Sequence, residues 1–183
     1  MQRYIKNFKN ANIYRKKIMK PSEIKVLKAK KAFFLLPRFR ALTWKGVVYC
    51  KNKTDIQLIN FEDKISSDFE SHEMIHVIQA ESTHDSWFCF YSLYLWYWIL
   101  NFPLFIRGLY MPYYFIPFEL EAMSHETDWK YSSEAVYKWK EFKKKLTMKQ
   151  KLQFAKDYKE NYKKYGMKWY IKNKIYPTII KED

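Results

Sequence analysis

Short apolar runs alternate with polar turns near the N-terminus, and this pattern predicts a small β-sheet. Lys45-Gly46 and Lys51-Asn52-Lys53 separate neighbouring runs and are typical turn sequences. The predicted strands are residues 32–36, 41–44, 47–50 and 55–59.

The pattern then changes to one that predicts helices. Residues 69–80 are apolar on much of the helical surface, and Ser66, Ser67 or Asp68 could cap that helix. Pro117 favours the first turn of a helix running to residue 123. Ser132 or Ser133 could cap a third helix that carries Ala135, Val136, Trp139, Phe142 and Leu146. Thr147 could cap a fourth, carrying Leu152, Phe154, Ala155 and Tyr158 before Gly166.

These elements predict a mostly helical α+β fold, with a small N-terminal sheet followed by helices. The 183 residues contain only three glycines and are 48% hydrophobic, which suits one helix-rich domain with its own core. We expect a basic lead-in over 1–31, a central domain over 32–146 and a basic helical extension over 147–183.

Residues 87–106 are unusually aromatic and leave three interpretations open. The segment could be a buried helix, an interfacial segment lying on a membrane, or a membrane span, since twenty residues just suffice to cross a bilayer. Ser92, Asn101 and Pro103 interrupt it, and its Trp and Tyr side chains prefer interfaces to a bilayer centre. The buried helix is therefore the interpretation we favour.

The net charge of +15 is concentrated at the two ends of the chain. Residues 1–32 hold eleven Lys/Arg and one Asp/Glu, and residues 130–183 hold sixteen and six. Residues 33–129 hold seven Lys/Arg and twelve Asp/Glu, which argues against a basic active cleft. The basic ends suit either a solvated surface or an anionic membrane. No stacking-aromatic motif indicates nucleic acid.

Cys50 and Cys89 are far apart and have no metal-binding spacing, which indicates free thiols. The first forty residues show no apolar core behind a basic start, so secretion is not indicated. We expect a cytoplasmic protein, with peripheral membrane contact as an alternative.

The strongest chemical signal is the HExxH motif of His72, Glu73 and His76. Histidines four apart lie on one helix face and can bind one zinc ion. Glu73 would then be the general base for a metal-activated water, as in metallopeptidases.

A catalytic zinc site needs a third protein ligand. The pattern with a third histidine requires glycine and histidine where this chain has Gln79 and Ser82. Glu119 and Glu121, on the predicted helix after Pro117, are the alternatives, and Glu119 is preferred.

With this pair of motifs the chain resembles gluzincin-type metallopeptidases, which combine HExxH with a later glutamate. More narrowly, it is similar to small bacterial proteins with an HEMIHxxQ helix and an IPFExEA helix. The resemblance covers about residues 33–145, and its matching residues are His72, Glu73, His76, Gln79, Ile116, Pro117, Phe118, Glu119, Glu121 and Ala122. It implies a zincin-like domain in which His72, His76 and Glu119 bind Zn²⁺ and Glu73 is catalytic.

One position departs from the gluzincin pattern. Many members carry an aspartate four residues after the ligand glutamate, where it orients a ligand histidine, and this chain has Met123. Glu121, His125 and Glu126 are candidates for that role. Glu121, His125 and Gln79 are each candidates either for an alternative metal ligand or for a residue that supports a ligand. Tyr113 or Tyr114 could stabilise a developing oxyanion.

The sequence therefore predicts a zinc metallopeptidase acting on a peptide or protein. Two alternatives stay open: an inactive zinc-binding protein of zincin type, and a basic aromatic scaffold at a membrane surface.

Overall fold

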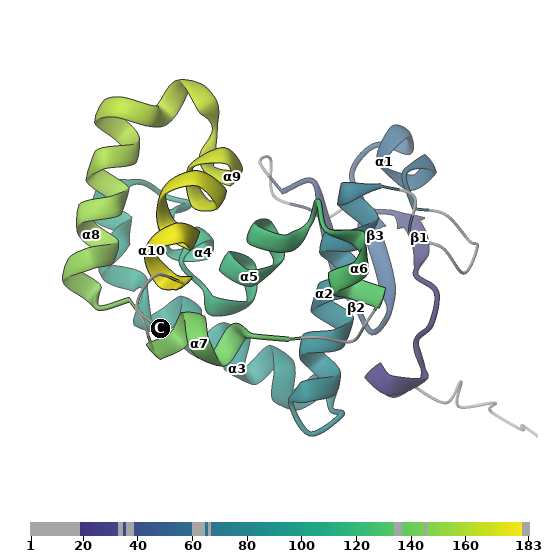
Figure 1. Ribbon diagram of the computed structural model, residues 1–183. Coiled ribbons are helices and arrows are strands. Elements are labelled where there is room, and N and C mark those ends of the chain that lie inside the picture. The colour runs from purple at the N-terminus through teal and green to yellow at the C-terminus, as the bar shows by residue number, and fades with distance from the viewer. Residues whose placement is uncertain are drawn as a thin grey trace, which may run out of the picture.

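The computed structural model describes residues 19–180, with gaps at 33–34, 36–38, 60–64, 66, 134–136 and 145. Part of the predicted lead-in and most of the strand at 32–36 lie outside these residues, as do Ala135 and Val136. The predicted class is confirmed: a small sheet precedes a mostly helical chain (Figure 1).

The sheet has three strands in the order β1-β3-β2, where β1 is Lys28–Lys31, β2 is Ala41–Trp44 and β3 is Val47–Cys50. β1 runs parallel to β3, with Lys28 opposite Val47, and β2 runs antiparallel to it, with Trp44 opposite Val47. Lys45 and Gly46 both have positive φ, 52° and 75°, as the tight hairpin between β2 and β3 requires. The two strands predicted at 41–44 and 47–50 are thus confirmed, and among the described strands β2 lies at an edge of the sheet.

The strand predicted at 55–59 is wrong, because helix α1 covers Lys53–Gln57. Its Asp55 is buried and accepts a hydrogen bond from Arg40 Nε at 2.7 Å. A tertiary ion pair therefore fixes the segment where the alternation of apolar residues suggested a strand.

The remaining helical elements follow in chain order. The α-helices are α2 (Asp68–Ser82), α3 (Trp87–Leu100), α4 (Met111–Tyr114), α5 (Pro117–His125), α6 (Trp129–Ser133), α7 (Trp139–Lys144), α8 (Met148–Asp157), α9 (Met167–Tyr170) and α10 (Tyr176–Ile180). The 3-10 and π segments are η1 (Pro21–Glu23), η2 (Phe102–Arg107), η3 (Tyr158–Tyr162), η4 (Lys163–Tyr165) and η5 (Ile171–Ile175).

The predicted helix starts hold for three of these helices. Ser67 caps α2 by accepting from the Glu70 amide, and Pro117 occupies the first turn of α5. Thr147 and Gln150 form a capping box on α8.

The helix predicted from Ser132 or Ser133 to Leu146 is not continuous, because Tyr137 and Lys138 are not helical. The Lys138 backbone N–H donates to the buried carboxylate of Glu121 instead. The Glu121 side chain, seventeen residues earlier in the chain, thus holds the non-helical backbone between α6 and α7.

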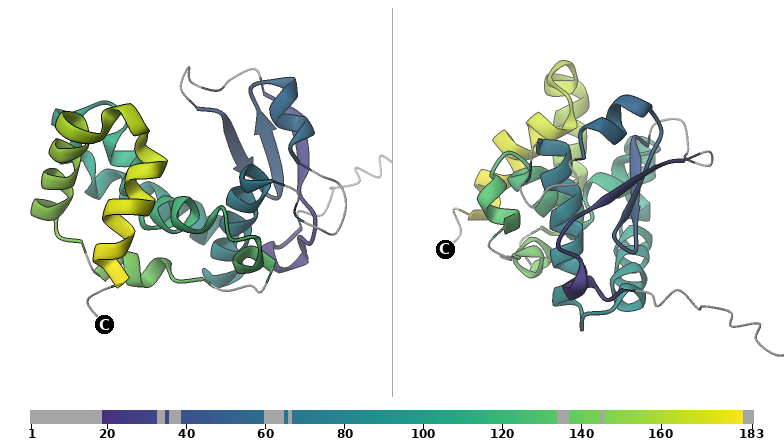
Figure 2. Two further views of the ribbon diagram at one scale, coloured as in Figure 1. Left: turned by 45° about the horizontal axis from the view of Figure 1, so that its top comes forward. Right: turned by 90° about the vertical axis from the view of Figure 1, so that its right-hand side faces the viewer.

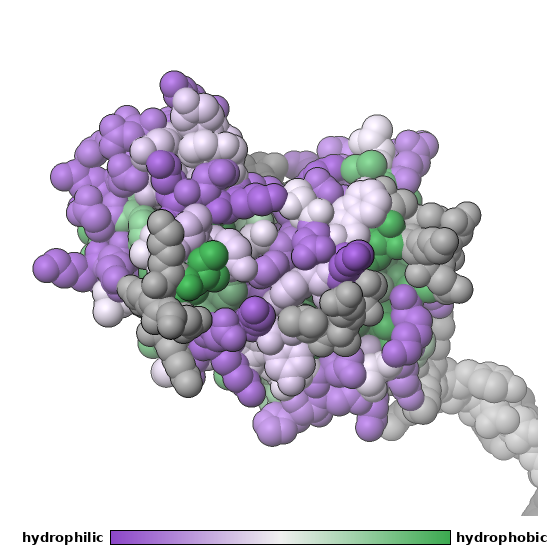
Figure 3. All heavy atoms as spheres, viewed as in Figure 1, coloured by the Kyte–Doolittle hydropathy of each residue, from purple (hydrophilic) through white to green (hydrophobic). Residues whose placement is uncertain are grey.

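Helix α2 is the central element, buried from Phe69 to Ala80. The sheet lies on one side of α2 and α5, and the C-terminal helices lie on the other (Figures 1 and 2). Hydrophilic side chains cover most of the face drawn in Figure 3, including most of the surface over α8.

Two apolar clusters meet at α5. The first joins the sheet, α2 and α3, and includes Ile116 and Phe118. The second includes Leu120 and Met123 and joins them to the C-terminal helices through Ala155, Met167, Tyr170, Ile171, Ile175 and Ile179. The segment beyond residue 146 therefore shares a core with α5. The division of the chain into a central domain and a C-terminal extension stays a prediction.

The aromatic segment 87–106 forms α3 and η2. Trp87, Phe90 and Tyr97 are buried in the first cluster, which agrees with a helix packed over α2. Among the described residues, no helix combines the length and apolar character needed to cross a membrane.

Candidate metal centre

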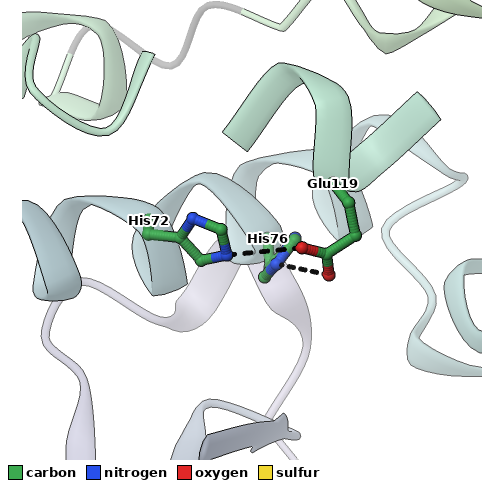
Figure 4. Close-up of side chains that lie close together, drawn as sticks. All are labelled: His72, His76 and Glu119. Carbon is green, nitrogen blue, oxygen red and sulfur yellow. Dashed lines mark ion pairs between the residues drawn. The ribbon is translucent and has the colours of Figure 1, made fainter. Parts of the chain in front are cut away.

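His72, His76 and Glu119 point toward one another from α2 and α5 (Figure 4). His72 Nε2 lies 3.5 Å from Glu119 Oε2, and His76 Nε2 lies 3.3 Å from Glu119 Oε1. All three side chains are buried, and one ligand atom from each falls within 4.8 Å of the others. The structure thus brings together the two histidines and the preferred glutamate.

The spacing of these atoms fits a zinc ion. Nitrogen and oxygen ligands about 2.0–2.1 Å from tetrahedral zinc lie roughly 3.4 Å from one another. Glu119 Oε2 is also buried and has no hydrogen-bond partner among the described residues, since its 3.5 Å approach to His72 lacks hydrogen-bond geometry. An unsatisfied buried carboxylate oxygen facing two imidazole nitrogens is a donor set that a cation would complete. The geometry leaves the identity of the metal open.

Without a bound cation, the two histidines of this group favour their protonated forms. Burial opposes charging of His72, but Glu119 and Glu126 raise its pKa to about 9. Burial likewise opposes ionisation of Glu119, yet His76 and His72 hold the pKa of its carboxyl well below the ordinary value. A metal ion must therefore displace protons from the histidines when it binds.

Glu126 supports His72 from the far side of its ring. His72 Nδ1 lies 3.1 Å from Glu126 Oε2, and the same oxygen accepts from Lys168 Nζ at 2.6 Å. This contact leaves Nε2 directed at Glu119. Glu126 thus occupies the orienting role for which Met123, buried in the second apolar cluster, has no polar group.

A second chain of hydrogen bonds supports His76. Gln79 Nε2 donates to Phe118 O at 2.9 Å and to Glu121 Oε2 at 2.6 Å, so the amide oxygen of Gln79 faces His76. That oxygen lies 2.8 Å from His76 Nδ1, which must therefore carry a proton and leave Nε2 as the ligand atom. Gln79 thus supports the His76 ring, which is one of the two roles considered for it from the sequence.

Glu121 and His125 lie outside the three-residue group. Both oxygens of Glu121 are engaged, one by Gln79 and the other by Tyr131 and the Lys138 amide. His125 stacks on Tyr131 with ring centroids 3.8 Å apart. Burial lowers the pKa of His125 to about 4, so it is neutral at pH 7.

Glu73 faces the same cavity as the metal-binding group. The cavity has a volume of about 280 Å³ and is mostly apolar, with Phe90, Tyr91, Tyr94 and Trp98 of α3 in its wall. Thr43, on the edge strand β2, donates a hydrogen bond to Glu73 Oε2. Thr43 and Glu73 are both buried, so this hydrogen bond is shielded from water.

Tyr94 and Tyr113 are the tyrosines beside the group. Tyr94 donates to Glu119 Oε1 at 2.8 Å, and burial together with Glu119 raises its pKa well above the usual value, which keeps the hydroxyl protonated. Tyr113 lines the cavity with Glu119. Tyr114 lines a neighbouring cavity, about 220 Å³ in volume, whose wall also includes His72 and Glu73.

The sequence did not predict Thr43 and Tyr94 as residues of the site. Thr43 lies thirty residues before Glu73, and no local pattern connects them. Tyr94 is one of several aromatic residues in α3, and only the fold selects it.

The chain was also compared with known proteins. No protein-family model matches it, and neither curated proteins nor solved structures show a significant match.

Proposed function

We propose that this protein is a zinc-dependent metallopeptidase in which His72, His76 and Glu119 bind the metal and Glu73 is the general base. The observation that carries the proposal is the buried group of ligand atoms, with Glu73 facing the same cavity. Bound zinc would supply a Lewis acid and make water acidic enough to lose a proton near pH 7.

The chain's own residues account for the proton transfers. Glu73 accepts the proton of the attacking water and passes it to the leaving amine, and Thr43 holds its carboxylate in place. Tyr113, which lines the same cavity, would donate a hydrogen bond where negative charge develops on the substrate carbonyl.

The edge strand supports a peptide as substrate. Ala41, Leu42 and Thr43 of β2 line the cavity, and β2 pairs with β3 on one side only among the described strands. An extended peptide could add to the free edge and place its backbone beside Glu73.

The test combines metal content with hydrolysis. Purified protein should contain about one zinc ion per chain by elemental analysis, and His76→Ala should lose it. Glu73→Gln should keep the zinc and reduce the hydrolysis rate of a broad peptide pool by about a hundredfold or more.

The two readouts separate the alternatives. No bound metal, even after zinc is offered at neutral pH, would reject the metal centre. Bound zinc in a wild-type protein that cleaves nothing would favour an inactive zinc-binding protein. Full activity in Glu73→Gln would reject the assigned base.

A further inference from the structure

Large apolar side chains are exposed along α3, η2 and the residues just after η2. We call this set the apolar stripe, and its members are Phe88, Leu95, Trp96, Ile99, Leu100, Phe102, Ile106 and Leu109. Phe88 is 80% exposed and Ile106 is 76% exposed. Scattered exposed apolar residues are ordinary, but eight in a run of twenty-two residues mark an interaction surface.

The helical spacing accounts for the part of the stripe that lies on α3. Phe88, Leu95 and Ile99 are seven and four residues apart, which places them on one face of α3. Phe90 and Tyr97 lie on the other face and are buried in the first apolar cluster. The stripe is therefore the side of α3 that the core leaves uncovered.

Positive charge borders the stripe. No Asp or Glu occurs from Ser86 to Phe118, a segment that contains Arg107. The Lys159 side chain lies against Gly108 at the end of η2.

We propose that the apolar stripe docks the protein on an anionic phospholipid membrane. Apolar and aromatic side chains would enter the boundary between headgroups and acyl chains, and Arg107 and Lys159 would contact anionic headgroups. The positive charge beside the stripe favours an anionic membrane over a second copy of this chain. In a symmetric dimer the basic residues of the two copies would repel each other. The inference does not depend on the proposed hydrolysis.

The same helix connects docking to the metal centre. Tyr91, Tyr94 and Trp98 of α3 line the cavity beside Glu73, and Trp98 packs edge-to-face on Phe105 of η2. Docking through α3 would hold the cavity near the membrane surface, where it would meet membrane-associated substrates.

The experiment is flotation of the full chain with two kinds of vesicle. One is phosphatidylcholine alone, and the other is an equimolar mixture of phosphatidylcholine and phosphatidylglycerol. The protein should float with the anionic vesicles, and added salt should weaken the association. Ile106→Asp and, separately, Leu95→Asp should weaken it by about tenfold or more, because each removes an inserted side chain and adds a repelled charge.

Leu58→Asp is the matched control. Leu58 is also an exposed leucine but lies at the end of α1, next to the sheet, so its change should leave vesicle binding intact. Unchanged circular dichroism in the variants would show that they fold.

Three results would overturn the proposal. They are failure to float with anionic vesicles, equal binding to both vesicle types, and undiminished binding by both stripe variants. A dimer in sedimentation that Ile106→Asp dissociates, without flotation of the wild type, would assign the stripe to self-association instead.

Discussion

Thr43 shows how a single residue can tie the sheet to the chemistry of α2. Its hydroxyl donates to Glu73 Oε2 from a strand that also lines the cavity. A carboxylate in an apolar wall has several rotamers, and one directed hydrogen bond selects the rotamer that faces the cavity.

Replacing Thr43 with Val removes this bond with little change in shape. A hydrogen bond to a charged group contributes about 1.5–3 kcal/mol, so we expect kcat to fall about tenfold or more while KM changes little. Steady-state kinetics on a cleaved peptide would measure both. Thr43→Ser keeps the hydroxyl and should restore most of the rate, and a Thr43→Val enzyme as fast as the wild type would contradict the role.

Glu126 shows how a residue at the end of α5 can hold a histidine of α2. Its carboxylate lies seven residues after Glu119 and 3.1 Å from His72 Nδ1. Lys168 holds the same oxygen from α9.

Glu126→Gln should weaken zinc binding by about tenfold or more, because a neutral amide makes the His72 ring a poorer ligand. Competition with a chromophoric zinc chelator would give the affinity. Lys168→Met is the matched control: its ion pair is half-exposed, so its loss should cost less than about threefold. A larger effect from Lys168→Met than from Glu126→Gln would count against this assignment.

Among the elements, the β2–β3 hairpin depends on its two-residue turn. Gly46 has a φ of +75°, and a Cβ there would approach Ile24 Cδ1 to 2.6 Å. Lys45, with a φ of 52°, already adopts a conformation that few side chains favour.

Gly46→Ala should lower the free energy of unfolding by about 1–2 kcal/mol, through backbone strain and displacement of Ile24. Lys45→Asn should leave stability equal or slightly higher, because asparagine tolerates positive φ. Urea unfolding monitored by circular dichroism would compare them. A Gly46→Ala variant as stable as the wild type would show that neither backbone conformation nor crowding at Gly46 matters.

Helix-start residues in the sequence predicted α2 and α5, the two helices that carry the site. Contacts between residues far apart in the chain determined the elements that were predicted wrongly. Ser67 and Pro117 mark the starts of α2 and α5 in the sequence itself. By contrast, the Arg40–Asp55 pair, which fixes α1, and the Glu121–Lys138 bond, which interrupts 132–146, join residues fifteen and seventeen positions apart. No periodicity within a single window could reveal them.

The candidate site follows the same rule. HExxH and the later glutamate sufficed to predict the three side chains that the fold brings together, because histidine and glutamate are the residue types that bind zinc. The choice of Glu119 over Glu121 depended on which side chain the fold turns toward α2. Glu121 instead accepts from Gln79, Tyr131 and Lys138.

At the scale of the whole molecule, the metal centre lies where the two apolar clusters meet. His72 and His76 belong to α2, which packs with the sheet, whereas Glu119 belongs to α5, which contributes to both clusters. A cation bound by all three would cross-link the halves of the molecule and bind only the folded chain.

Zinc should therefore stabilise the whole fold. At a free zinc concentration one hundred times Kd, the gain is about 2.7 kcal/mol, which corresponds to a rise in Tm of about 5–10 °C for a chain of this size. Calorimetry with and without a chelator would measure it. His76→Ala should abolish the shift, but Glu73→Gln should retain it, because Glu73 is not a ligand. Magnesium should give no shift, since it disfavours imidazole. A zinc effect that survives in His76→Ala would place the stabilising ion elsewhere on the chain, and the metal centre would then have to be reassigned.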